Sequence, residues 1–343
     1  MNAYNIQVIE NVKSKRIIEI DYLKTLAMFL VVFGHFLECF YSSYSNLLYQ
    51  LIYLFHIPLF VFISGYLSRF KYRDLFKFCL LYLIFYFLYA GFNHILYGSD
   101  LTLTFFHPYW ILWYLMSLIF WKMSLPLLDK ISNKYHLLTI IITFVFGLYV
   151  GSCGIVNRFF SMSRTLAFFP FFVLGYYKRK QNSLSFNTKI TNITKLLGVL
   201  LVLISFTCLI MLGLFLTASF YMADPYSGLR HSVYQRLIIY VFAFFMIYFI
   251  CSISISRENI LIKNISNNTL TIFLFHGFII NIFKRYSFLS NRNLSILISF
   301  VLSIIVLLVF TFIGILYSKI KEKLVKKHSS AHIFNEDIEP KSF

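Results

Sequence analysis

The chain has 343 residues, of which 59% are hydrophobic and only 13% are charged. Soluble domains carry about 25% charged residues, so this composition excludes a soluble globular protein and indicates a polytopic membrane protein. The formal net charge of +18 is spread over short loops, which argues against nucleic-acid binding and is explained by membrane topology and attraction to anionic lipids.

The segment 1–16 is polar, and neither it nor the apolar run after it has the pattern of a secretory signal peptide. The segment 17–318 is predicted to be the transmembrane domain. The tail 319–343 begins basic and ends acidic, and we expect a frayed helix followed by disorder there. About 20 apolar residues are needed for a helix to cross a bilayer. Ten apolar segments are candidate spans: 17–38, 46–67, 74–97, 109–128, 136–153, 164–178, 196–220, 233–255, 266–283 and 293–318.

The predicted fold is therefore all-α, a bundle of about ten transmembrane helices. The second span contains Pro58 and the short sixth span contains Pro170, so either is a candidate for a kink or an incomplete span. Ten spans put both termini on one side of the membrane. That side has 23 Lys and Arg residues and the opposite side has 7, so the positive-inside rule predicts that both termini are cytoplasmic.

The first span places two ionisable side chains in an apolar helix, "DYLKTLAMFLVVFGH" at 21–35. Lys24 and His35 are eleven residues apart, about three helical turns, so they share one face at a separation of about 16 Å. Snorkelling of Lys24 and a helix–helix hydrogen bond of His35 are the structural alternatives. Because ionisable groups do not face lipid stably, we predict that both line one water-accessible cavity inside the bundle.

The two side chains suit different chemistry. A neutral imidazole can take the proton of a hydroxyl as that hydroxyl attacks a carbonyl, which makes His35 a candidate general base. A transient covalent carrier is the alternative for His35. Lys24 supplies a fixed positive charge nearer the cytoplasm, where it could meet a phosphate or a developing negative charge.

The stretch "RIIEIDYLKTLAMFLVVFGH" at 16–35 resembles the first helix of the membrane acyltransferase-3 family. That family includes polysaccharide O-acetyltransferases and fucose-4-O-acetylase-like proteins, and its first helix has a basic residue, ten others and then His. Four later stretches resemble further family segments in the same order: "FHIPLFVFISGYL" (55–67), "WILWYLMSLIF" (110–120), "RTLAFFPFFVLGYY" (164–177) and "LTIFLFHGFII" (270–280).

The resemblance implies an O-acetyltransferase in the plasma membrane of a bacterium. It would move an acetyl group from acetyl-CoA, a co-substrate, to a sugar hydroxyl. The acceptor would be a cell-surface polysaccharide, such as a capsule, O-antigen or exopolysaccharide, or its lipid-linked precursor. Membrane lipids are the other expected partners, and we expect no permanently bound cofactor, no metal and no nucleic acid.

The resemblance also implies roles for particular residues. His35 and Lys24 are the predicted catalytic residues. Arg69, Lys71 and Arg73 are predicted to bind the acyl donor through the phosphates of CoA. The positive-inside bias of the cytoplasmic loops is the alternative explanation for these three.

Acceptor binding is predicted for His56, Arg158, Arg164 and Trp113. His56 precedes Pro58, so a hydrogen bond to a carbonyl freed by that proline is its structural alternative. The two arginines lie on the side where basic residues are rare and could instead contact lipid headgroups. Trp113 could instead be an interfacial aromatic residue.

The rival function is export of a glycan or lipid-linked sugar, with Lys24, His35 and His56 lining a permeation path. A glycan polymerase is a third possibility, although the outer loops are short for one. The sequence contains no Gly-rich phosphate loop, HExxH motif or nucleophile elbow. Its five cysteines lack ligand-like spacing and are expected to be inert buried thiols.

Overall fold

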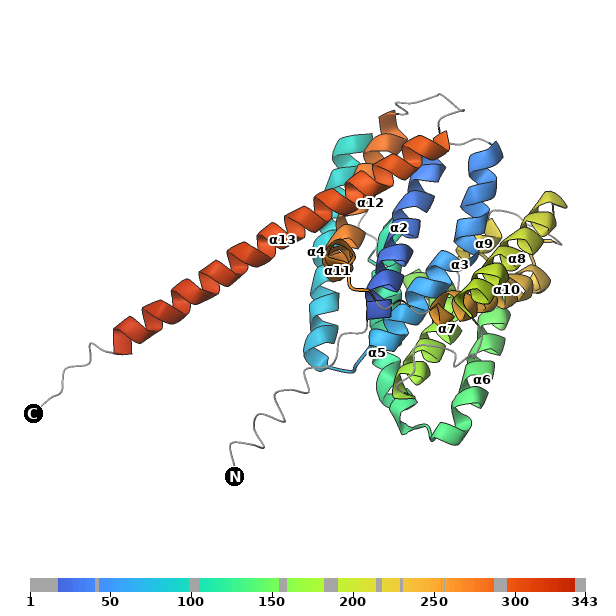
Figure 1. Ribbon diagram of the computed structural model, residues 1–343, viewed down its shortest axis with the longest axis horizontal. Coiled ribbons are helices and arrows are strands. Elements are labelled where there is room, and N and C mark those ends of the chain that lie inside the picture. The colour runs from blue at the N-terminus through green and yellow to red at the C-terminus, as the bar shows by residue number, and fades with distance from the viewer. Residues whose placement is uncertain are drawn as a thin grey trace, which may run out of the picture.

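The computed structural model describes residues 18–40, 43–98, 105–153, 159–181, 191–213, 218–228, 231–253, 255, 257–286 and 295–336. These residues form helices, and no strand is found among them (Figure 1). The α-helices are α2 (Ile18–Cys39), α3 (Ser43–Leu67), α4 (Tyr72–Tyr97), α5 (Trp113–Lys130), α6 (His136–Tyr149), α7 (Met162–Lys180), α8 (Asn192–Met211), α9 (Ala218–Tyr221), α10 (Val233–Ser252), α11 (Ile260–Asn267), α12 (Thr269–Tyr286) and α13 (Ser295–Glu336).

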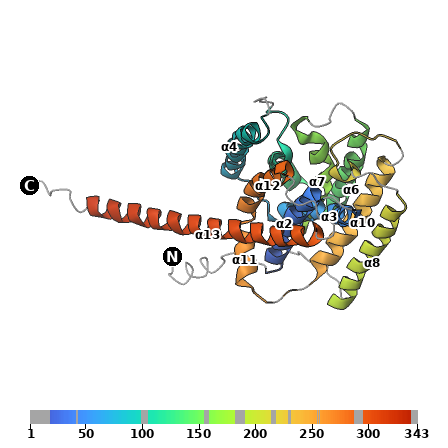
Figure 2. The same ribbon diagram turned by 90° about the horizontal axis from the view of Figure 1, so that it is seen from above.

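The predicted bundle of about ten spans is confirmed. Nine helical segments in the described ranges are long and apolar enough to cross a membrane, and the bent pair α11–α12 makes a tenth if it is one span. Helix α3 continues through Pro58 and α7 continues through Pro170. Helix α13 runs past the predicted domain boundary at 318 as far as Glu336. Seen from above, α2 and α3 lie between α4 and α12 on one side and α8 and α10 on the other (Figure 2).

Helices α3 and α7 cross through two glycines. A Cβ atom added at Gly65 would lie closer than 3.0 Å to the backbone of Phe172, and one added at Gly175 would lie closer than 3.0 Å to the backbone of Phe62. Small residues allow helix backbones to approach in membranes, where van der Waals packing drives helix association. The two glycines therefore fix the close crossing on which the centre of the bundle is built.

Gly175→Ala is expected to destabilise the protein, because backbone atoms of a neighbouring helix cannot move aside as a flexible side chain can. We expect a lower yield and a fall in Tm in detergent. Gly91→Ala is the matched control, since a Cβ atom there meets nothing within 4 Å and alanine favours a helix by about 1 kcal/mol over glycine. An unchanged Tm for Gly175→Ala would contradict the close crossing.

The break between α11 and α12 lies beside the first span. The two helices are bent by 72°, which leaves backbone carbonyls at the end of α11 without their helical partners. The Lys24 ammonium donates to the carbonyl oxygen of Ser266, and the Ser266 hydroxyl donates to Asp21 at 2.6 Å. A cation at a helix C-terminus complements the helix dipole. Lys24 therefore has a structural contact that explains part of its presence in an apolar helix.

Candidate functional site

Two cavities lined by described residues lie in opposite halves of the bundle. We call the larger one, of about 600 Å³, the histidine cavity. It is built from the C-terminal parts of α2 and α12, the N-terminal parts of α3, α5 and α7, and segments on either side of them. Its lining is His35, Glu38, Tyr53, His56, Ile57, His107, Pro108, Trp110, Trp113, Ser161, Arg164, Phe168, Phe220, Tyr221, Ala223, Asp224 and Lys284.

The smaller cavity, of about 270 Å³, is called the lysine cavity. It is formed at the N-terminal end of α2, the C-terminal end of α3 and the middle of α5, which is the half of the bundle where the described chain begins. Its lining is Lys24, Phe60, Ile63, Ser64, Leu67, Ser68, Phe78, Tyr114, Leu115, Leu118, Lys122, Thr269, Leu270 and Phe273.

The predicted single cavity shared by Lys24 and His35 is therefore replaced by two. An aromatic layer of Phe60, Tyr114 and Phe273 lines the lysine cavity and is absent from the lining of the histidine cavity. The ring centroid of Tyr114 lies 5.0 Å from that of Phe60 and 5.5 Å from that of Phe273. These rings come from α3, α5 and α12, and the ring of Phe273 lies 6.0 Å from that of His276, which stacks on His35 at 5.6 Å.

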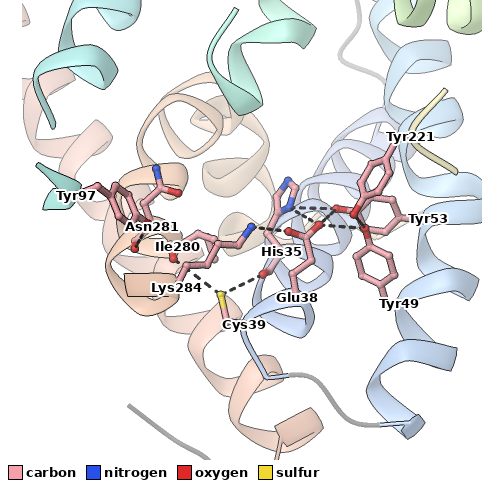
Figure 3. A network of polar contacts seen from close by, with 10 residues as sticks. All are labelled: His35, Glu38, Cys39, Tyr49, Tyr53, Tyr97, Tyr221, Ile280, Asn281 and Lys284. Atoms are coloured by element: carbon pink, nitrogen blue, oxygen red, sulfur yellow. Dashed lines mark hydrogen bonds and ion pairs between the residues drawn. The ribbon is translucent and has the colours of Figure 1, made fainter. Parts of the chain in front are cut away.

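His35 lies in the wall of the histidine cavity, as its predicted role requires. Its Nδ1 lies 3.1 Å from the Tyr53 hydroxyl oxygen and 3.4 Å from Glu38 Oε1. The indole of Trp110 packs edge-on against the imidazole at a centroid distance of 4.6 Å. Figure 3 shows the second ring nitrogen pointing away from this carboxylate. The ring is thus held on one edge by α2 and α3, and its other edge is available to a ligand.

Glu38 is the centre of a polar network that joins α2, α3, α9 and α12 (Figure 3). It accepts hydrogen bonds from Tyr53 at 2.7 Å, from Tyr49 at 3.1 Å and from the Lys284 ammonium at 2.7 Å. The hydroxyls of Tyr49 and Tyr221 are also hydrogen-bonded to each other. Burial raises the pKa of Tyr221, so that phenol stays neutral. The network explains how a carboxylate is retained inside an apolar bundle.

Two further imidazoles are oriented by their own helices. The Nδ1 of His56 lies 2.9 Å from the carbonyl of Ile52, and the Nδ1 of His276 lies 2.8 Å from that of Phe273. A carbonyl only accepts, so each Nδ1 carries the proton and each Nε2 is an acceptor. Both Nε2 atoms are buried without a partner among the described residues. His56 lines the histidine cavity, although its Nε2 itself is enclosed by the protein.

The remaining predicted acceptor residues fall partly in this cavity. Arg164 and Trp113 both line it, and the guanidinium stacks over the indole at 4.9 Å. The Arg164 Nε also donates to the carbonyl of Tyr221 at 3.2 Å, which fixes the segment after α8 against α7. Arg158 lies outside the described residues. The structure therefore brings His35, His56, Arg164 and Trp113 together around one space.

The predicted donor-binding residues lie at the other end of the bundle. Arg69, Lys71 and Arg73 are exposed between α3 and the first turn of α4. The carbonyl of Arg69 accepts from Lys122 at 3.4 Å, and Lys122 lines the lysine cavity. The carbonyl of the preceding residue, Ser68, accepts from Arg179. Lys122 and Arg179 thus both bond to the backbone at Ser68 and Arg69, and Ser68 is part of the lining of the lysine cavity.

Sequence reasoning missed four charged residues at these sites. Lys122, Arg179 and Lys284 enter it only through the count of basic residues on the two sides of the membrane, and Glu38 is given no role. The signal that was available for Glu38 is its spacing, three residues after His35, which places both on one helix face. In the part of the chain that the structure describes, no group of three or more His, Cys, Asp or Glu side chains could hold a metal ion.

Comparison with known families gives one match. A family model described as an acyltransferase domain matches residues 17–318, which covers most of the chain. Comparisons with curated proteins and with solved structures gave no match.

Proposed function

The chain belongs to the acyltransferase-3 family and is a membrane acyltransferase, and we propose that it is an O-acetyltransferase of surface glycans. In this proposal acetyl-CoA is the donor. A sugar hydroxyl of a cell-surface polysaccharide, or of its lipid-linked precursor, is the acceptor, and the plasma membrane of a bacterium is the location. The observation that carries the proposal is the placement of His35 in the wall of a large polar and aromatic cavity.

The histidine cavity suits a sugar acceptor. Its volume of about 600 Å³ lies within the usual range of ligand pockets, about 300–1,000 Å³. Trp110 and Trp113 are part of its lining and supply apolar ring surface against which a sugar can pack. Arg164 and Asp224 lie on the same lining and supply donors and acceptors for hydroxyl groups.

The lysine cavity suits the donor. Its apolar walls and narrower volume of about 270 Å³ match the acyl-carrying arm of CoA. The exposed Arg69, Lys71 and Arg73 lie where the phosphates of CoA would remain outside the bundle. Arginine and lysine bind phosphate through charge-assisted hydrogen bonds. Lys24 lines the cavity and places a positive charge near the acyl-carrying arm of CoA.

Acetyl transfer then needs one proton movement, which His35 performs. The imidazole takes the proton of the sugar hydroxyl while the hydroxyl oxygen forms a bond to the thioester carbonyl carbon. The carbon–sulfur bond breaks as the carbonyl re-forms. The CoA thiolate leaves and takes the proton back from His35, so the products are the O-acetyl sugar and CoA with a free thiol.

The acetyl group must pass the aromatic layer to reach His35. Phe60, Tyr114 and Phe273 line only the lysine cavity, and the Tyr114 hydroxyl is held by Ser64 at 2.7 Å. Side-chain rotation at these rings would join the cavities. A closed layer would also keep water and ions from leaking between the two halves when no donor is bound.

The proposal is tested by surface polysaccharide analysis in cells that carry the protein. We expect NMR to detect O-acetyl groups with the wild type and none with His35→Ala, while the amount of polymer stays constant. The exporter alternative is favoured by the two-sided cavities and the broken α11–α12 pair, features that transporters share. Loss of surface polymer with unchanged acetyl content per sugar would support export and reject the proposal.

A further inference from the structure

We infer that Glu38, held by Lys284, is a positioning residue that determines which nitrogen of His35 carries the proton. The inference rests on the proposed function, because it concerns how His35 is prepared to act as a base. Neither residue needs to touch the substrate for this role. The donors and acceptors of the network in Figure 3 lead to this assignment.

The contacts of Glu38 indicate an ionised carboxylate. Oε1 accepts the Tyr53 proton at 2.7 Å and Oε2 accepts from the Lys284 ammonium at 2.7 Å. A protonated carboxyl would have to donate from one of these oxygens. An ionised carboxylate only accepts, and it matches donors on both oxygens.

The tautomer of His35 follows from the same contacts. A tyrosine has one hydroxyl proton, and that of Tyr53 is directed to Glu38. At 3.1 Å from His35 Nδ1, the Tyr53 oxygen can therefore only accept, so Nδ1 must be the donor. Glu38 Oε1 at 3.4 Å is a second acceptor on the same edge of the ring. In a neutral imidazole with its proton on Nδ1, Nε2 is the basic nitrogen.

Lys284 keeps this arrangement in place. Its ammonium pairs with Glu38 and lies 4.2 Å from the centre of the Trp110 ring, and Trp110 is also the ring packed against His35. A buried carboxylate without a cation is strongly disfavoured. Without Lys284, Glu38 would be expected to take up a proton or turn toward water, and either change would remove the acceptor from the Nδ1 edge.

The test compares initial rates of transfer from radiolabelled acetyl-CoA to endogenous glycan in membranes, normalised to the amount of protein. Glu38→Gln, which keeps the shape of the side chain, should lower the maximal rate on the order of 100-fold. The KM for acetyl-CoA should stay at the wild-type value, because Glu38 lies in the other cavity. Lys284→Met should lower the maximal rate similarly.

Coupling between the two residues is tested by the double variant. If Lys284 acts only through Glu38, then Glu38→Gln with Lys284→Met should be no slower than Glu38→Gln alone. Arg285→Met is the matched control, because that neighbouring cation bonds to the Leu96 carbonyl on the exposed side. It should keep the wild-type rate.

Two results would overturn the inference. One is a wild-type maximal rate for Glu38→Gln, and the other is a double variant whose loss equals the product of the two single losses. If Glu38→Gln does not fold, Tyr53→Phe tests the same network: a rate about 10-fold lower supports the positioning role, and an unchanged rate rejects it. Activity of His35→Ala would reject the proposed function itself, whereas inactive His35→Ala with normal Glu38→Gln rejects only the positioning role.

Discussion

His35→Ala is expected to lower acetyl transfer by about 10²- to 10⁴-fold, the usual contribution of a general base. The loss should fall on the maximal rate, because the other residues of the histidine cavity remain in place to bind the acceptor. The measurement is the initial rate of transfer from radiolabelled acetyl-CoA in membranes that contain equal amounts of each variant. Protein yield and Tm should stay near the wild-type values.

His94→Ala is the control for this experiment. His94 is exposed on α4 and does not line either cavity, so its variant should transfer acetyl at the wild-type rate. Transfer by His35→Ala at more than about a tenth of the wild-type rate would contradict a role for the imidazole in proton transfer.

Lys24→Met is expected to reduce both stability and activity. The variant removes the charged donor to the Ser266 carbonyl at the break between α11 and α12 and leaves only the Thr269 hydroxyl at 3.2 Å, and a hydrogen bond to a charged group contributes about 1.5–3 kcal/mol. It also removes the positive charge from the lysine cavity, so we expect a higher KM for acetyl-CoA or a loss of transfer. The measurements are Tm in detergent and transfer kinetics in membranes.

Lys24→Arg separates the two effects. Arginine keeps the charge and can donate to the carbonyl, but it cannot reproduce the compact ammonium, so we expect intermediate activity and nearly normal Tm. A fully stable and fully active Lys24→Met would show that neither the contact with Ser266 nor the charge in the cavity matters.

The helices could be predicted from the sequence because the length and the hydrophobicity of a segment are local properties. The structure adds that α3 and α7 run through their prolines, and that α11 and α12 are sharply bent. The bend has no strong local signal. It depends on Lys24 and Asp21, more than 200 residues away, to satisfy polar groups at the break.

The candidate site was predictable only in part, for a related reason. Helical periodicity shows which side chains share a face, and it correctly predicted that Lys24 and His35 face the interior of the bundle. It does not show what other helices place against that face. Phe60, Tyr114 and Phe273 come from three different helices and line only the cavity of Lys24, so Lys24 and His35 lie in two cavities instead of one.

The partner of Glu38 was beyond sequence reasoning. Lys284 is 246 residues away, and a lysine near the end of an apolar span is readily explained by an interfacial position. Only the packing of α12 on α2 brings the two charges together. The role of Tyr53 could not be predicted either. Its hydroxyl links His35 to Glu38, but nothing in the sequence distinguishes it from the other tyrosines among the 25 in the chain.

The most direct test of the account is the sidedness of the reaction, because donor and acceptor are assigned to cavities in opposite halves of the bundle. Radiolabelled acetyl-CoA, which does not cross membranes, would be added to sealed inverted vesicles whose cytoplasmic face is outward. The account predicts labelled glycan inside the vesicles, protected from an added glycosidase, and no labelling with His35→Ala. Labelled glycan found only outside the vesicles, on the same side as the donor, would contradict it.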